Sequence, residues 1–386
     1  METASTSPAR PPYLDVDFDR TPFTLAWEIT RACALSCIHC RAEATPQRDA
    51  NELTTKEAFQ VLDQIVDLGK PILVVTGGDP MMRRDVFDIL GGAVERGLKV
   101  GFSPSATRLV TRAAIERVRD VGVDMVHVSL DGSCPEVHDT FRRVRGAYQR
   151  TREIAADVRD VGLPLQIGTT VSRHNIADLP AIADAVRQIG ATVWNAFFLV
   201  PTGRGQQDAM LTPGEHEEVL QWLADLSERV PFRVRTTAAQ HYRRVLIQRR
   251  RAKAASGDQP KEFELTGAGY AFREGKAPTE KGVNDGKGFC FISHVGDVYP
   301  SGFLQLCAGN VRTASLASLY RDSELFRSLR DPAQLQGKCG QCDFKEVCGG
   351  SRARAWATTG NHLAQEPCCV YQPAAPDPSR ATDAGC

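Results

Sequence analysis

The chain has 386 residues, 42% of them hydrophobic, and its 47 basic and 47 acidic side chains give a formal net charge of zero. This balance argues against a globally basic nucleic-acid-binding protein. The N-terminus lacks the apolar core of a signal peptide, and no apolar run reaches the roughly 18 residues that a membrane helix needs. We therefore expect a cytoplasmic protein with one large and one smaller domain, and neither nucleic-acid nor membrane partners.

The first chemistry-bearing stretch follows a short N-terminal arm. Residues 1–20 are rich in Pro, Ser and Thr and predict a disordered arm, and residues 23–30 predict a strand. The strand leads into RACALSCIHCR, where Cys33, Cys37 and Cys40 have CxxxCxxC spacing. Three thiolates on one loop can bind three irons of a four-iron cluster and leave the fourth open to a small molecule. A zinc loop using His39, or three unrelated thiols, are the alternatives, although zinc loops usually pair CxxC units.

A regular alternation of strands and helices follows. Residues 54–68 predict a helix with a Thr54–Glu57 capping box and a terminating Gly69. We expect further strands at 72–76, 99–102, 125–130, 165–171 and 192–200, and helices at 86–96, 111–119, 147–158 and 179–189. Six β/α units predict an α/β fold, a partial barrel with a parallel sheet inside and helices outside. Loops after the strands share one end, so the cysteine loop, residues 77–80 and residues 131–132 should meet there.

The next segment connects this core to the C-terminal region. Residues 212–229 and 242–255 predict helices, and the second helix is strongly basic. Its basic side chains are Arg243, Arg244, Arg249, Arg250, Arg251 and Lys253. A solvated basic face is the favoured interpretation, and a site for an anionic substrate or acidic partner is the alternative. Residues 267–288 are rich in Gly and Lys and predict a mobile loop or substrate lid.

A second group of cysteines lies near the C-terminus. Cys339, Cys342 and Cys348 have CxxCxxxxxC spacing, and Cys368 and Cys369 follow about twenty residues later. Clustered cysteines in a chain without a secretion signal indicate metal ligation in preference to disulfides. Four thiolates would close an iron–sulfur cluster that transfers electrons or supports the fold, and structural zinc is the alternative. Cys386, in a Pro/Ala/Asp tail, is expected to be a free thiol.

Three motifs together resemble the radical S-adenosylmethionine (radical SAM) enzymes: the cysteine loop, TGGDP at 76–80, and VSLDG at 128–132 followed by HDTFR. In that family a [4Fe-4S] cluster binds SAM and cleaves it to a 5′-deoxyadenosyl radical. The resemblance implies a partial (β/α)6 TIM-like barrel and places the cluster on the three cysteines of the loop. The implied SAM contacts are Thr76, Gly77, Gly78, Asp79, Pro80, Ser129 and Arg142.

One of these positions departs from the family pattern, and another has its own physical argument. Asp79 stands where the family usually has Glu. A guanidinium such as that of Arg142 suits the SAM carboxylate, with a surface salt bridge as the alternative role.

The C-terminal cysteines resemble a SPASM domain, the auxiliary-cluster extension of many radical SAM enzymes. A complete SPASM domain holds two clusters, but the expected cysteine positions read Ser301 and Arg352 or its neighbour Ser351. Cys290 and Cys307 remain without obvious partners. The resemblance therefore implies one auxiliary [4Fe-4S] cluster on Cys339, Cys342, Cys348 and Cys368, with Cys369 as the alternative to Cys368.

Further segments resemble the haem-biosynthesis branch, which makes haems from siroheme and for denitrification: 197–205 (FFLVPTGRG), 285–303, 309–312 (GNVR) and 348–360 (CGGSRARAWATTG). That branch implies removal or oxidation of tetrapyrrole side chains, with the auxiliary cluster accepting the electron. Arg352, Arg354 and the basic helix would then pair with propionates. They would equally suit the acidic leader of a precursor peptide, so a peptide maturase stays open, as does a non-catalytic zinc or iron–sulfur protein.

The resemblance also fixes the expected domains and partners. The domains are an arm at 1–20, the radical SAM core at 21–235, a connector at 236–285, the auxiliary-cluster domain at 286–373 and a tail at 374–386. The expected partners are a small-molecule or peptide substrate and an electron donor such as flavodoxin or ferredoxin.

Overall fold

The computed structural model describes residues 16–256, 264–265, 270–271 and 282–374. Residues 1–15 of the predicted arm, most of the predicted loop at 267–288 and all but the first residue of the predicted tail lie outside these residues. Among the described residues, no helix combines the length and the apolarity needed to cross a bilayer.

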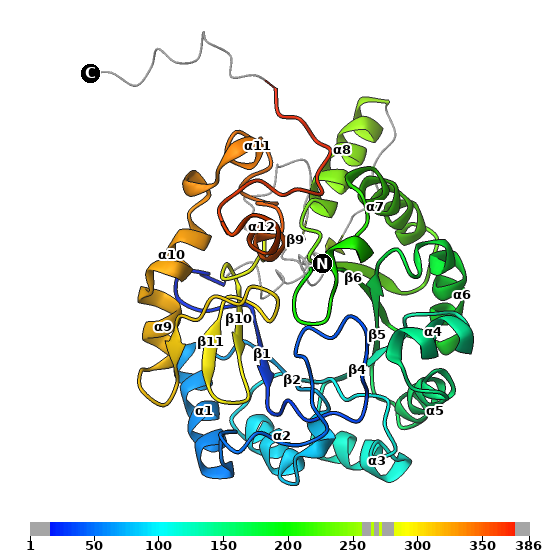
Figure 1. Ribbon diagram of the computed structural model, residues 1–386, viewed down its shortest axis with the longest axis vertical. Helices are drawn as coiled ribbons and strands as arrows, with labels where there is room; N and C mark the ends of the chain where they lie inside the picture. Colours follow the sequence, from blue (N-terminus) through cyan, green and yellow to red (C-terminus); the bar gives the residue numbers. More distant parts are fainter. Residues whose placement is uncertain (1–15, 257–263, 266–269, 272–281, 375–386) are drawn as a thin grey trace, which may run out of the picture.

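Seven strands in chain order pair in parallel and curve around the centre of the molecule (Figure 1). They are β1 Thr24–Glu28, β2 Ile72–Thr76, β3 Val100–Phe102, β4 Met125–Ser129, β5 Leu165–Val171, β6 Val193–Phe198 and β7 Arg233–Thr237. The six predicted strands are confirmed within two residues at each end. The seventh, β7, was missed because its sequence RVRTT holds one apolar residue among polar ones and has no hydrophobic pattern.

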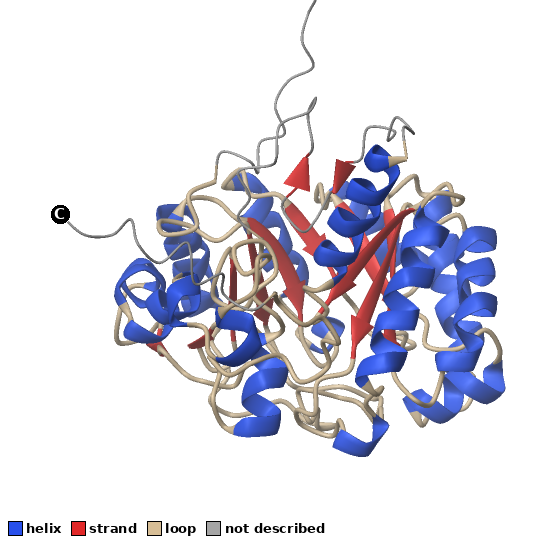
Figure 2. Ribbon diagram, turned by 90° about the horizontal axis from the view of Figure 1, so that it is seen from above, coloured by secondary structure: helices blue, strands red, loops and turns tan. Residues whose placement is uncertain are grey.

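Helices cover the outer face of this sheet, as Figure 2 shows from above. They are α1 Thr55–Leu68, α2 Val86–Glu95, α3 Arg112–Asp120, α4 Pro135–Arg142, α5 Ala147–Asp160, α6 Leu179–Ile189 and α7 Pro213–Ser227. In α1 the predicted capping box between Thr54 and Glu57 is present, and the buried apolar residues lie on one stripe. Helix α4 was missed because only His138 and Phe141 are buried along its eight residues.

The barrel is open, as the fold class requires. Strand β7 forms one edge, while β1 pairs in parallel with β10 (Phe289–Ile292), which comes from the C-terminal region. Antiparallel strands β11 (Asp297–Tyr299) and β12 (Gly309–Asn310) then complete a ten-stranded sheet. The C-terminal region is therefore joined to the core by a shared sheet. Strands β8 Glu264–Leu265 and β9 Tyr270–Ala271 form a separate two-stranded antiparallel sheet.

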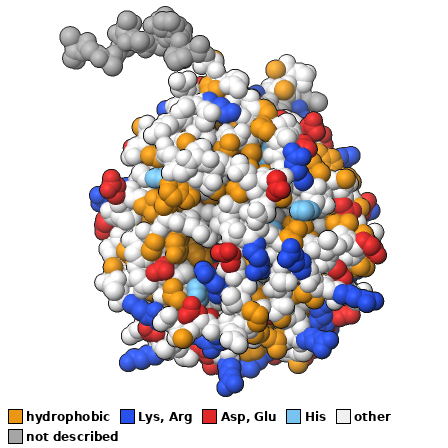
Figure 3. All heavy atoms as spheres, in the orientation of Figure 1, with side chains coloured by type: hydrophobic (Ala, Val, Ile, Leu, Met, Phe, Trp, Pro, Cys, Tyr) orange, Lys and Arg blue, Asp and Glu red, His pale blue; other side chains and the backbone are white. Residues whose placement is uncertain are grey.

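The basic helix α8 (Tyr242–Ala255) packs along α7, and this contact gives three of its six basic side chains an acidic partner. Arg244 and Arg249 form ion pairs with Glu217 and Asp225 of α7, and Lys253 Nζ lies 2.6 Å from Glu228. These three cations are paired with acidic side chains of the neighbouring helix, whereas Arg251 is exposed, so the helix is not a uniformly solvated basic face. On the face shown in Figure 3, basic and acidic side chains are likewise interspersed.

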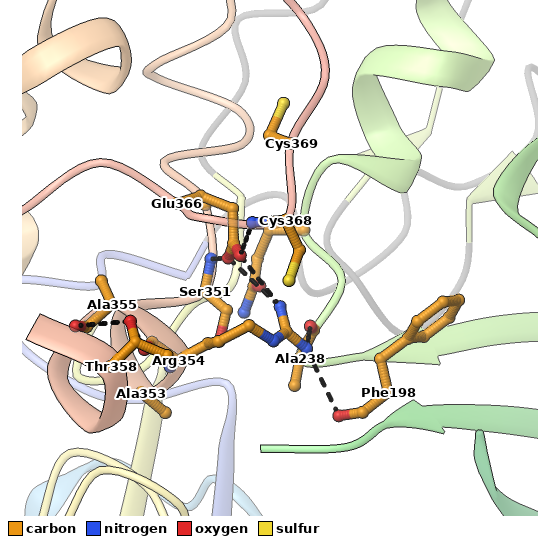
Figure 4. A network of polar contacts seen from close by, with 12 residues as sticks. Phe198, Ala238, Ser351, Ala353, Arg354, Ala355, Thr358, Glu366, Cys368 and Cys369 are labelled. Carbon is orange, nitrogen blue, oxygen red and sulfur yellow. Dashed lines mark hydrogen bonds and ion pairs between the residues drawn. The ribbon is translucent and has the colours of Figure 1, made fainter. Parts of the chain in front are cut away.

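The C-terminal region adds four more helices: α9 Leu316–Asp322, α10 Glu324–Arg330, α11 Gly337–Gly340 and α12 Arg352–Thr359. Arg354 of α12 docks this region on the barrel, as Figure 4 shows. Its guanidinium lies 3.1 Å from Glu366 and donates to the carbonyl oxygens of Ala238 at 2.7 Å and Leu199 at 3.3 Å. Arg352 donates to backbone carbonyls and is also buried. Neither arginine is free to pair with propionates, which corrects that expectation.

Candidate active site

A cavity of about 210 Å³ opens at the carboxyl ends of the parallel strands. Such a volume exceeds that of a packing defect, since one water-sized probe needs only ~10–15 Å³. The cavity is lined by the loops that follow successive strands. The predicted site residues that line the cavity are Cys33, Cys37, Cys40, Thr76, Gly77, Gly78, Ser129 and Arg142. The structure thus brings residues that are more than 100 positions apart in the sequence into one hollow.

The cysteine loop is held in shape by the loop that follows β6. The Arg204 guanidinium donates to the carbonyl oxygens of Cys37 at 2.9 Å and Ala44 at 3.1 Å. The Arg204 N–H donates to Cys40 O at 3.0 Å, and a Cβ on Gly203 would lie 2.6 Å from the same oxygen. The segment FFLVPTGRG, singled out from the sequence, therefore clamps the backbone that carries the cysteines.

Polar groups surround the sulfur atoms of this loop. The Leu35 N–H donates to Cys33 Sγ at 3.3 Å, and Ser105 Oγ lies 3.5 Å from the same sulfur. The Arg142 guanidinium donates to Cys37 Sγ at 3.7 Å. Burial outweighs the hydrogen bonds to Cys33 and raises the pKa of its thiol, so binding of a metal would have to drive deprotonation to the thiolate, the form that ligates metal. All eleven cysteines among the described residues are free thiols.

The donor set suits an iron–sulfur cluster. In the described residues, no group of three or more His, Cys, Asp or Glu side chains is arranged to hold one metal ion. A four-iron cluster takes one thiolate on each of several irons. Three buried or half-buried thiols on one loop, facing a cavity, match that pattern.

Gly77 and Gly78 make room for the cysteine loop. A Cβ on Gly78 would lie 2.6 Å from the carbonyl oxygens of Arg31 and Ala32, and one on Gly77 would lie 2.7 Å from Thr30 O. Both distances are shorter than a real Cβ contact. The glycine pair is therefore required by close approach between two backbones, in addition to lining the cavity.

Asp79 and Pro80 lie beside the cavity and do not line it. The buried Asp79 carboxylate accepts hydrogen bonds from the Thr107 hydroxyl at 2.7 Å and from the backbone N–H groups of Met81 and Ser105. Burial raises the pKa of this carboxyl group, against the effect of these donors. Asp79 thus fixes the loop after β3, which contributes Ser105 to the cavity wall.

Arg142 reaches the cavity from the end of α4. Its guanidinium forms a buried ion pair with Asp131 and also donates a hydrogen bond to Cys37 Sγ. Although burial lowers the pKa of Arg142, the charge of Asp131 raises it above its ordinary range. The guanidinium is therefore a fixed positive charge at the cavity wall. Ser129, the last residue of β4, also lines the cavity.

Three further residues line the cavity. The sequence suggested His39 only as a ligand of an alternative zinc loop, and it gave no role to His138 or Phe303. His39 stacks on Phe141 with ring centroids 4.2 Å apart, and its Nδ1 is buried without a partner among the described residues. The His138 Nδ1 accepts a hydrogen bond from the Asp131 N–H. Phe303 comes from the C-terminal region, so that region completes the cavity wall. Lone histidines and a phenylalanine carry no spacing signal, whereas the segment 285–303 had been noted.

A second pocket collects the C-terminal cysteines. Cys339, Cys342, Cys348 and Cys369 line it, together with Arg244, Lys338 and Tyr371. Cys368 does not line it, and its sulfur lies 4.0 Å from Leu211 O. Figure 4 shows the sulfur atoms of Cys368 and Cys369 on opposite sides of the chain. The structure thus groups the alternative, Cys369, with the other three thiols.

The remaining candidate positions have other structural roles. Cys290 is buried in β10, and Cys307 is exposed. Ser301 accepts hydrogen bonds from the N–H groups of Phe303 and Leu304, and Ser351 caps α12. In the described part of the chain these residues do not join the second pocket.

Comparison with known proteins agrees with this geometry. Residues 27–186 match the model of the Radical SAM superfamily. The chain is 40% identical to the AdoMet-dependent heme synthase of Methanosarcina barkeri over 91% of this chain and 97% of that protein. It is 29% identical to the Mycofactocin maturase MftC of Mycobacterium tuberculosis over 95% of this chain and 87% of that protein. The fold resembles that of Streptococcus suis SuiB bound to S-adenosylmethionine, with a TM-score of 0.68 and 16% identity. The match covers 91% of this chain and 78% of the SuiB chain.

Proposed function

The chain belongs to the radical SAM superfamily, and we propose that this radical SAM enzyme acts on the side chains of a haem-precursor tetrapyrrole. The observation that carries the proposal is the similarity to AdoMet-dependent heme synthases along nearly the whole chain. The similarity to the maturase is weaker over a comparable length. A peptide substrate is therefore the second candidate.

The family implies a [4Fe-4S] cluster and SAM, and we assign the cluster to Cys33, Cys37 and Cys40. When bound, this cluster supplies the electron that splits SAM into methionine and a 5′-deoxyadenosyl radical. Arg142, held by Asp131, would offer its charge to the SAM carboxylate, and Ser129 would offer a hydroxyl from the lining of the same cavity.

Apolar side chains of the cavity would protect the reaction. Phe197, Phe198, Leu199, Val200 and Phe303 give the cavity an apolar lining. Such a lining excludes water and stray hydrogen donors from a radical.

We further propose one auxiliary [4Fe-4S] cluster on Cys339, Cys342, Cys348 and Cys369. When bound, it supplies an acceptor for the electron that remains when a propionate side-chain radical loses CO₂ and becomes a vinyl group.

Metal analysis tests the ligand set of this auxiliary cluster in the full-length chain with Cys33, Cys37 and Cys40 changed to Ala. Adding Cys369→Ser should lower the remaining iron, while adding Cys368→Ser, the matched neighbour, should not. The reverse result would restore the set containing Cys368, and zinc in place of iron would favour the non-catalytic metal protein.

Substrate trials test the function itself. The anaerobically reconstituted enzyme, with SAM and a chemical reductant, should form 5′-deoxyadenosine faster when a coproporphyrin or siroheme derivative is added. Mass spectrometry should show loss of CO₂ from that tetrapyrrole, and the Cys33→Ala variant should show neither effect. No response to any tetrapyrrole, together with binding of a short peptide encoded nearby, would favour the maturase. Flavodoxin or ferredoxin is the proposed physiological electron donor.

A further inference from the structure

A buried histidine faces the second pocket without a hydrogen-bond partner. His241 precedes α8 and is 1% exposed. It lines the pocket together with the thiols of Cys339, Cys342, Cys348 and Cys369. Within the described residues, neither of its ring nitrogens has a hydrogen-bond partner. Buried polar groups are almost always paired, so an unpaired imidazole at a pocket points to a group that is bound there.

The surroundings of His241 define its state. Burial lowers its pKa to about 4, although Glu366 acts in the opposite direction; Arg354, Arg244 and Glu217 also face it. The ring is therefore neutral near pH 7, with one N–H donor and one acceptor nitrogen. The nearby cations have other partners: Arg244 binds Glu217, and Arg354 binds Glu366.

His241 also stands at the end of a row of rings that begins in the active-site cavity. Phe198 lines that cavity and stacks on His216 with centroids 4.9 Å apart. His216, on α7 and equally buried, lies 5.7 Å from His241 between centroids. His216 does not line the second pocket. The two histidines are therefore equally buried and lie next to each other, but only His241 lines the pocket that contains the cysteines.

We propose that His241 donates a hydrogen bond to the iron–sulfur cluster held by Cys339, Cys342, Cys348 and Cys369, and thereby raises its reduction potential. The inference depends on the auxiliary cluster proposed above. Four thiolates already satisfy the irons, so the imidazole acts as an outer hydrogen-bond donor and not as a ligand. Hydrogen bonds to cluster sulfurs stabilise the reduced, more negative state. His241 is thus a positioning residue that tunes the electron acceptor.

The test uses the full-length chain with Cys33, Cys37 and Cys40 changed to Ala, so that a single cluster gives the signal. We compare His241→Phe, His241→Gln and the matched control His216→Phe by redox titration monitored with electron paramagnetic resonance. The Phe variant at 241 should lower the midpoint potential. In the Gln variant, which keeps an N–H donor, the midpoint potential should lie between those of the Phe variant and the parent. His216→Phe should leave the potential unchanged.

Each other outcome overturns a definite statement. If the cluster has the same midpoint potential in His241→Phe as in the parent chain, this inference alone is overturned. A pocket without iron and sulfide overturns the auxiliary cluster and this inference with it. If His241→Phe fails to fold, pulsed spectroscopy of the reduced parent chain decides. A weak coupling to a histidine nitrogen supports the hydrogen bond, whereas no coupling, or the strong coupling of a direct ligand, overturns it.

Discussion

Replacing Arg354 with alanine should destabilise the protein far more than removing an arginine from its surface. The Arg354 and Glu366 side chains are 0% and 1% exposed and lie 3.1 Å apart. Glu366 also accepts hydrogen bonds from the N–H groups of Ser351 and Cys368, so it stays anchored when its partner is lost. The variant therefore leaves a buried carboxylate without a counter-charge.

The size of the effect follows from this burial. Removing one partner of a buried ion pair costs roughly 3–5 kcal/mol of unfolding free energy. The carbonyl oxygens of Ala238 and Leu199 lose their donor as well, although water entering the vacated space would offset part of that loss. The matched control is Arg249→Ala, whose pair with Asp225 has side chains 27% and 52% exposed. Such a pair contributes roughly 0–1 kcal/mol.

Thermal unfolding of anaerobically reconstituted protein at equal cluster loading measures the difference. We expect a much larger fall in the midpoint for Arg354→Ala than for Arg249→Ala. Adding Glu366→Gln to Arg354→Ala should recover part of the loss, because a neutral amide needs no counter-ion. Equal falls for the two arginine variants would refute the argument that Arg354 docks the C-terminal region through a buried pair.

Three shorter predictions concern the active-site cavity. Arg204→Ala should release iron to a chelator several-fold faster than the parent, because the carbonyl oxygen of Cys37 loses its donor; an unchanged rate would contradict the clamp. Gly78→Ala should lose the first cluster in metal analysis, because its Cβ meets backbone atoms, whereas Gly91→Ala, with nothing within 4 Å, should keep it. Phe303→Ala should raise the ratio of 5′-deoxyadenosine to modified substrate, because water then reaches the cavity; a constant ratio in product analysis would argue against a shielding role.

Local signals in the sequence predicted most of the fold. The capping box of α1 and the apolar runs of β2 and β5 are complete within a few residues, so their elements were found with nearly correct ends. Strand β7 was not predicted because none of its residues is fully buried and its sequence has no hydrophobic pattern; only its pairing with β6 defines it. The pairing of β10 with β1 is a contact between distant segments, and nothing in either segment announces it.

The same distinction holds for the sites. The spacing of Cys33, Cys37 and Cys40 predicted their grouping because one loop carries all three. The choice between Cys368 and Cys369 depends on which way adjacent side chains point, and composition does not encode that direction. His241 gave no signal at all, since a single histidine before a helix has no pattern.

The pairing of β1 with β10 also has a consequence for biosynthesis. During translation β1 leaves the ribosome with β2 soon beside it, but its other edge stays open until residues 289–292 have been made. An open strand edge recruits other chains, so the nascent protein passes through an aggregation-prone interval. A ribosome that stops within residues 257–285 would release a chain whose cysteine loop is complete but whose first strand is unprotected. Expression at low temperature, or with chaperones that bind exposed edges, should therefore improve the yield of intact protein.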